Sequence, residues 1–191
     1  MELLAVTKGF GPEVVRAAAA VGCTAIGENY AQELAAKASV VAETGVAVHF
    51  IGQLQSNKVR LVADVVGVWE TIDRPSIVRE VARRAPGATV LVQVDATGEP
   101  GKGGCPPGDV AALVDAAGEA GLVVDGLMTV GPTAGGPEAA RPSFRTVRAL
   151  VDRFGLRTCS MGMSGDLEVA VQEGATRVRL GTALFGSRRA V

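Results

Sequence analysis

The chain alternates short apolar runs with longer segments that have the hydrophobic period of a helix. The runs recur about every 20 to 30 residues, and turn residues follow each one. This order is typical of βα units, which build parallel sheets. Eight such runs are present, at residues 3–7, 24–27, 48–52, 65–71, 89–95, 124–130, 158–163 and 177–185.

Eight strands with intervening helices favour a closed barrel over an open doubly wound sheet, which usually has fewer strands. The chain has 191 residues, of which 48% are hydrophobic, so it can bury one substantial core. We therefore expect an α/β fold in which residues 1–191 form a single (β/α)8 TIM-type barrel domain. Because the eighth run extends to Phe185 and five residues follow Gly186, we expect no helix after strand eight, and another element or a partner subunit would cover that flank.

Two of the intervening helices show clear inward-facing stripes. Ile77, Val78 and Val81 lie opposite charged residues, and Pro75 suits the first turn of that helix. Residues 144–154 carry a second stripe of helical spacing. We interpret both stripes as packing surfaces.

Charge and cysteine content exclude several classes of function. Lys and Arg number 19 against 20 for Asp and Glu, so a net charge of −1 gives no general attraction to nucleic acid or anionic membranes. No apolar segment is long enough to span a membrane, and no signal peptide is recognisable, so we expect a cytoplasmic protein. Cys23, Cys105 and Cys159 are odd in number and widely spaced, which supports neither a disulfide framework nor a zinc site.

Lys8 is the first candidate for chemistry. It follows the first apolar run directly, and the carboxyl ends of parallel strands are where ligands collect in α/β folds. A lysine amine in such a place can react with a carbonyl group when its surroundings lower its pKa. The alternative is a solvated cation at a strand end.

Two segments near the C-terminus are candidates for a phosphate site. Ser164 follows the seventh run, where it can cap the next helix and leave N–H groups facing an anion. In the eighth run, Gly181 permits close approach and Thr182 offers a hydroxyl. These are the ends of strands seven and eight, the usual phosphate position of this barrel. An ordinary helix cap and a packing glycine are the alternative.

Two other features of the sequence are weaker evidence for a functional site. The segment 98–104 lacks the spacing of a nucleotide-binding loop, and we expect a mobile lid loop there. His49 is the only histidine, and a core or rim histidine is favoured over a metal ligand because two further ligands are not grouped with it. We expect no metal site and no Ser-His-Asp triad.

Five motifs together resemble the pyridoxal 5'-phosphate homeostasis protein family (YggS/PROSC type), whose alanine racemase-like barrel is of fold-type III. They are LAVTK at 4–8, GENYAQE at 27–33, HFIGQLQSNK at 49–58, SMGMSGDLE at 160–168 and VRLGTALFG at 178–186. Family members usually carry a leading helix before the lysine strand, whereas seven residues precede Lys8 here. The resemblance therefore implies a barrel that lacks the usual N-terminal helix, and it leaves monomer or weak dimer open.

The resemblance implies pyridoxal 5'-phosphate as cofactor and assigns roles to six residues. It implies a Schiff base between Lys8 and the cofactor aldehyde, with Asn29 near the ring or its 3'-oxygen. Arg179 would lie beside the pyridine nitrogen. Around the phosphate it places Ser164, Gly181 and Thr182.

A carrier is favoured over an enzyme, so no catalytic residue is expected. The permanent charge of Arg179 would disfavour protonation of the pyridine nitrogen and weaken the ring as an electron sink. A racemase also needs a second acid or base, and Tyr30 is the only tyrosine. The alternatives are a low-activity amino-acid racemase and a barrel that binds another phosphorylated metabolite. Partners considered for a carrier are amino acids and cofactor-free pyridoxal phosphate enzymes.

Overall fold

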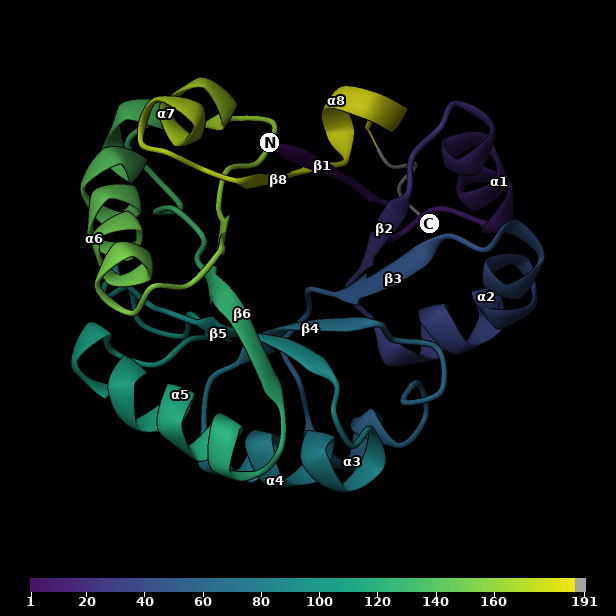
Figure 1. The fold of residues 1–191 in the computed structure, drawn as a ribbon. Coiled ribbons are helices and arrows are strands. Elements are labelled where there is room, and N and C mark those ends of the chain that lie inside the picture. The colour runs from purple at the N-terminus through teal and green to yellow at the C-terminus, as the bar shows by residue number, and fades with distance from the viewer. Residues whose placement is uncertain (188–191) are drawn as a thin grey trace.

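The computed structural model describes residues 1–187 and contains eight parallel strands that close into a barrel (Figure 1). Each strand pairs with the next one along the chain, and β8 pairs with β1, with Leu4 opposite Arg179. The predicted (β/α)8 barrel is therefore confirmed. The strands are β1 (Glu2–Val6), β2 (Ala25–Glu28), β3 (Ala47–Phe50), β4 (Val68–Ile72), β5 (Thr89–Gln93), β6 (Val123–Met128), β7 (Thr158–Ser160) and β8 (Arg177–Leu180).

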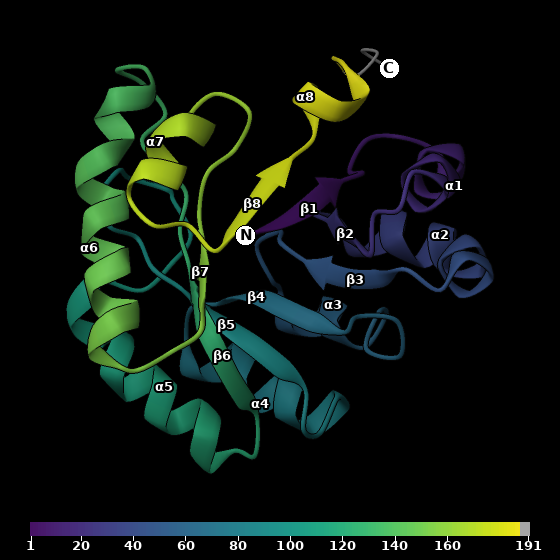
Figure 2. The same ribbon diagram turned by 45° about the horizontal axis from the view of Figure 1, so that its top comes forward.

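Helices α1 to α7 lie around the outside of the strands (Figures 1 and 2). The predicted stripe of α4 is buried at Ile77, Val78 and Val81. In α6 the buried residues include Phe144 and Val147. The helices are α1 (Pro12–Ala20), α2 (Ala31–Thr44), α3 (Ser56–Val59), α4 (Pro75–Arg84), α5 (Val110–Glu119), α6 (Arg141–Arg153), α7 (Leu167–Gln172) and α8 (Thr182–Phe185), with 3-10 turns η1 (Pro107–Asp109) and η2 (Pro137–Ala140).

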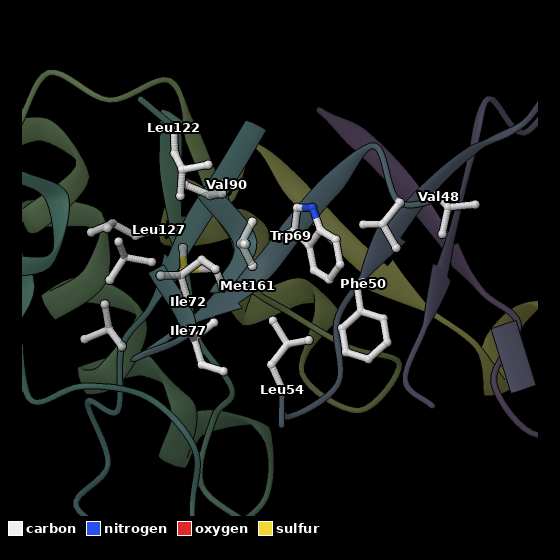
Figure 3. Close-up of a cluster of buried hydrophobic side chains, with 14 of the residues drawn as sticks. Val48, Phe50, Leu54, Trp69, Ile72, Ile77, Val90, Leu122, Leu127 and Met161 are labelled. Carbon is white, nitrogen blue, oxygen red and sulfur yellow. The ribbon is translucent and has the colours of Figure 1, made fainter. Parts of the chain in front are cut away.

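The main apolar core lies between the strands and the surrounding helices, and Figure 3 shows part of it. Trp69 of β4 is completely buried, and its ring centroid lies 6.0 Å from that of Phe50 on β3. Burial of each large apolar side chain stabilises the fold by about 1.5–3 kcal/mol. This layer holds the strands in place, so that the strand ends can carry polar groups.

The sequence analysis expected a last strand that extends to Phe185 and no helix after it, and this prediction was wrong. Strand β8 ends at Leu180, and the apolar residues that follow form the one-turn helix α8 beyond the end of the strand (Figure 2). Gly181 leaves the extended conformation with φ −118° and ψ −72°, which turns the chain out of the sheet. Phe185 then packs edge-on against Phe10, with ring centroids 5.7 Å apart.

Within the part of the chain that the structure describes, no helix combines the length and the apolar character needed to cross a bilayer.

Candidate functional site

A cavity of about 260 Å³ opens at the carboxyl ends of the barrel strands. It brings together residues from both ends of the chain, and Lys8 and Thr182 lie 174 positions apart. Five of the six predicted site residues line it. The full lining is Val6, Lys8, Phe10, Ile51, Met163, Ser164, Gly165, Arg179, Gly181 and Thr182.

Lys8 lies two residues beyond the end of strand β1, which ends at Val6. Both residues line the cavity, and Lys8 is partly buried. The amine is therefore carried by the turn just beyond the sheet.

Ser164 and Thr182 contribute two hydroxyl groups to the same wall, but Ser164 does not cap the next helix as predicted. The N-cap position of α7 is Asp166, whose carboxylate accepts a hydrogen bond from the Met163 N–H at 2.6 Å. The Ser164 hydroxyl instead accepts a hydrogen bond from the Ala183 N–H at 3.1 Å. This bond joins the two predicted phosphate segments across the cavity.

Gly181 lies where the end of β8 passes close to the end of β1. A Cβ atom at this position would lie 3.2 Å from the backbone oxygen of Val6 and 3.4 Å from its Cβ. The separation of 3.2 Å is tighter than ordinary van der Waals contact, so a larger residue would require the neighbouring backbone to shift by a few tenths of an ångström. The glycine therefore keeps the chain before Thr182 close to the chain before Lys8.

Arg179 is buried, and its guanidinium is held by three hydrogen bonds. Nη1 donates to the backbone oxygen and to the hydroxyl of Ser160, both at 2.9 Å, and Nη2 donates to the backbone oxygen of Thr129 at 2.7 Å. Burial lowers the pKa of Arg179, while the negative charge of Glu70 opposes this decrease. The guanidinium is thus fixed in orientation at the floor of the cavity.

Glu70 is the centre of a buried polar network that sequence reasoning missed. Its carboxylate accepts a hydrogen bond from the Ser160 hydroxyl at 2.6 Å and one from Arg177 at 3.2 Å, and His49 Nδ1 lies 2.6 Å away. Because β4 does not neighbour β7 or β8, the contacts of Glu70 with Ser160 and Arg177 cross the inside of the barrel. The network therefore supports Arg179 from below through Ser160.

The charges around Glu70 decide its protonation. Burial tends to raise the pKa of Glu70, but the hydrogen bond with His49 and the charges of Arg179 and Arg177 outweigh it and hold that pKa below its usual value. Glu70 is thus an anion between two buried arginines. His49 is itself buried, so the prediction of a core histidine is confirmed.

Two sequence patterns indicate this buried network. Glu70 is a carboxylate inside the apolar run 65–71, where an unpaired charge would be costly. Arg177 and Arg179 are two residues apart on one strand and so share a face. Both patterns indicate a buried ion pair without naming its partner.

Asn29 does not line the Lys8 cavity. It lies beside a neighbouring cavity of about 370 Å³ that Gln53 and Lys58 also line. The backbone oxygen of Asn29 packs against Gly52, where a Cβ atom would come within 1.9 Å of it. Phe50, the last residue of β3, lines this second cavity, and the next residue, Ile51, lines the Lys8 cavity.

The donor set of the Lys8 cavity suits an organic anion that carries a carbonyl group. One amine, one guanidinium and two hydroxyls converge there, and Gly165 and Gly181 leave backbone groups accessible. Within residues 1–187, no group of three histidine, cysteine or acidic side chains could hold a metal ion.

Comparisons with known proteins identify the family of the chain. The family model of the alanine racemase N-terminal domain matches residues 1–189. A pyridoxal phosphate homeostasis protein of Pseudomonas aeruginosa is 40% identical over 193 residues, covering 97% of this chain and 84% of the relative. A protein of the same name from Aquifex aeolicus is 39% identical over 199 residues, covering 98% of this chain and 87% of the relative.

Solved structures give the same result. PipY of Synechococcus elongatus, solved with PLP bound, is 30% identical with a TM-score of 0.87, and the match covers 97% of this chain and 92% of PipY. The same protein without PLP gives a TM-score of 0.90. Sequence and fold agree, and the chain belongs to the pyridoxal phosphate homeostasis protein family, built on the alanine racemase N-terminal domain.

Proposed function

We propose that this protein binds pyridoxal 5'-phosphate in the Lys8 cavity and serves intracellular vitamin B6 homeostasis by holding the cofactor without strong catalytic turnover. The observation that carries the proposal is the convergence of Lys8, Arg179 and the Ser164–Thr182 wall on one cavity. The relative PipY, with PLP bound in its structure, supports the choice of ligand.

Each group has a role that matches its chemistry. When bound, the cofactor supplies an aldehyde carbon that can bond covalently to the Lys8 nitrogen. The hydroxyls of Ser164 and Thr182, with the N–H groups beside Gly165 and Gly181, would hold the phosphate. Arg179 would face the pyridine ring as a hydrogen-bond donor. Asn29, in the neighbouring cavity, would contact the ring edge or its 3'-oxygen.

The ionisable groups of the cavity argue for holding over turnover. Among the described residues that line it, Lys8 and Arg179 are the ionisable ones. The Arg179 guanidinium already donates to Ser160 and Thr129 and has no proton acceptor function. A racemase needs a second acid or base opposite the lysine, and Tyr30 lies at the neighbouring cavity. We therefore propose a cytoplasmic carrier whose recipients are cofactor-free pyridoxal phosphate enzymes.

The test combines a binding titration with an activity assay. Purified protein is titrated with pyridoxal 5'-phosphate, and the visible absorbance band of the bound cofactor is followed in the wild type, in Lys8→Ala and in the control Lys58→Ala. We expect saturable binding that Lys8→Ala loses and Lys58→Ala retains. Equal binding by Lys8→Ala would refute the site.

The same loaded protein is then incubated with L-alanine or L-serine, and the enantiomers are separated by chiral chromatography. The proposal predicts no sustained conversion. Multiple turnovers that depend on Lys8 would replace the carrier by a racemase.

A further inference from the structure

The backbone that carries Lys8 lies beyond the support of the sheet. The ladder between β1 and β2 ends at Val6 opposite Gly27, and the Thr7 N–H makes a last bond to the Gly27 oxygen at 3.1 Å. Gly9 follows with φ +75°, so the chain turns sharply directly after Lys8. Strand pairing alone therefore does not determine where the Lys8 side chain points.

A second lysine, Lys37 of α2, lies buried behind this turn. Only 3% of its side chain is exposed. Its ammonium donates to the backbone oxygen of Thr7 at 2.9 Å, to Glu28 at 2.7 Å and to Glu33 at 2.6 Å. These three bonds use all three N–H donors of a lysine. Such full pairing is what makes a buried ammonium tolerable, because an unpaired one costs several kcal/mol.

The acceptors of Lys37 hold the chain on both sides of Lys8. The Thr7 hydroxyl donates to the same Glu28 oxygen at 2.6 Å, and the Gly9 N–H donates to the same Glu33 oxygen at 2.7 Å. The residue before Lys8 and the residue after it are thus tied to one cation. We call Thr7, Glu28, Glu33 and Lys37 the Lys37 cluster.

The cluster also depends on Lys37 for its charge balance. Glu28 is fully buried, and its second carboxylate oxygen has no hydrogen-bond partner. Burial raises the pKa of Glu28, whereas the hydrogen bonds from Lys37 and Thr7 oppose that increase. Two acidic side chains therefore share one ammonium, and among residues 1–187 Glu28 forms an ion pair with Lys37 alone.

We propose that Lys37 is a positioning residue whose ammonium fixes the turn of Thr7 to Gly9 and thereby directs the Lys8 amine into the cavity. The proposal rests on the proposed function, in which Lys8 is the attachment point of the cofactor. Lys37 itself does not line the cavity. Its effect must therefore appear as a change in the reactivity of Lys8.

The variants follow from the geometry. Lys37→Met removes the ammonium at similar length, Lys37→Arg keeps the charge, and Glu33→Ala removes the acceptor of the Gly9 N–H. Glu43→Ala is the matched control, because Glu43 also lies on α2 but forms an exposed ion pair with Arg16 at 2.7 Å.

Two readouts separate positioning from general loosening. Cofactor-free protein is treated with formaldehyde and borohydride, and methylation of Lys8 is measured by peptide mass spectrometry relative to Lys58 in the same molecule. Cofactor affinity is measured from visible absorbance. We expect Lys37→Met to change the Lys8-to-Lys58 ratio and to weaken affinity about tenfold, the effect of losing a charged hydrogen bond. Lys37→Arg should restore part of both, and Glu43→Ala should match the wild type.

An unchanged ratio and unchanged affinity in folded Lys37→Met would overturn the proposal, as would parallel changes at Lys8 and Lys58, which indicate loosening of the whole fold. If Lys37→Met does not fold, Glu33→Ala decides, since 23% of the Glu33 side chain is exposed. A wild-type Lys8-to-Lys58 ratio in Glu33→Ala would then refute positioning. Failure of the wild type to bind cofactor would refute the proposed function instead, because the methylation ratio is measured without cofactor.

Discussion

Replacement of Glu70 by glutamine tests the buried network most severely. The Glu70 carboxylate is fully buried and lies within hydrogen-bond distance of His49, Ser160 and Arg177. Glutamine keeps the size of the side chain but replaces one acceptor oxygen by an NH2 group that cannot accept from Ser160 or Arg177. The change leaves two buried arginine cations, Arg177 and Arg179, without the anion between them.

The expected magnitude follows from this geometry. Removal of one partner of a buried ion pair costs about 3–5 kcal/mol, and because glutamine retains one acceptor we expect a loss of about 3 kcal/mol in the free energy of unfolding. For a domain of this size, 1 kcal/mol shifts Tm by about 2–4 °C, so Tm should fall by about 6–12 °C. Binding of the cofactor should weaken as well, because Arg179 loses its support through Ser160.

The pH dependence has a definite sign. The pKa of Glu70 is lowered from the usual value of 4.5 despite burial, owing to His49 and the two arginines. The native state therefore binds fewer protons at this group than the unfolded state does. The stabilisation is present above a pH of about 4.5 and is lost as the pH falls through the lower folded value. The difference between wild type and Glu70→Gln should thus shrink as the pH falls below about 4.5.

Urea unfolding followed by circular dichroism at several pH values measures these differences. Glu43→Gln is the control, since its exposed ion pair with Arg16 should leave the midpoint unchanged. A loss for Glu70→Gln of less than about 1 kcal/mol, the net value of one ordinary hydrogen bond, would refute the reasoning. A difference from wild type that stays constant from neutral pH to acid pH well below 4.5 would refute the charge argument alone.

Two further predictions concern thiols and glycines. Burial raises the pKa of Cys105 and that of Cys159 to about 11 each. Iodoacetamide at pH 8 should therefore label the partly exposed Cys23 in native protein and the other two cysteines only after unfolding. Peptide mapping measures the labelling, and rapid labelling of either buried thiol would contradict the prediction. Gly162→Ala should destabilise by about 2–4 kcal/mol, because φ is +92° and a Cβ atom would lie 2.4 Å from an alanine of α7. Gly155→Ala is the matched control, with φ +63° and open space, and should cost only about 1 kcal/mol in urea unfolding; equal effects would contradict the clash.

Sequence patterns predicted the barrel because each strand and helix shows its own period. The same local logic failed after Leu180, since Leu184 and Phe185 continue an apolar run whose end is decided by the backbone of Gly181. It also failed for Ser164, because the bond to the Ala183 N–H depends on how two strand ends meet in space.

Some residues of the candidate site could be predicted from the sequence and others could not, for the same reason. Lys8, Arg179 and Thr182 were recognised from motifs, and the structure brings them to one cavity. Glu70 was missed because Ser160, which donates to it, lies 90 residues away along the chain. Contacts across a barrel interior depend on closure of the sheet, and no local periodicity encodes their partners.

Covalent mapping of the cofactor tests the central claim most directly. Protein loaded with pyridoxal 5'-phosphate is reduced with borohydride and digested, and the modified peptide is identified by mass spectrometry. The account predicts one fixed adduct on Lys8, absent from Lys8→Ala and present in Lys58→Ala. Adducts spread over surface lysines such as Lys58 and Lys102, or an equal yield in Lys8→Ala, would contradict it.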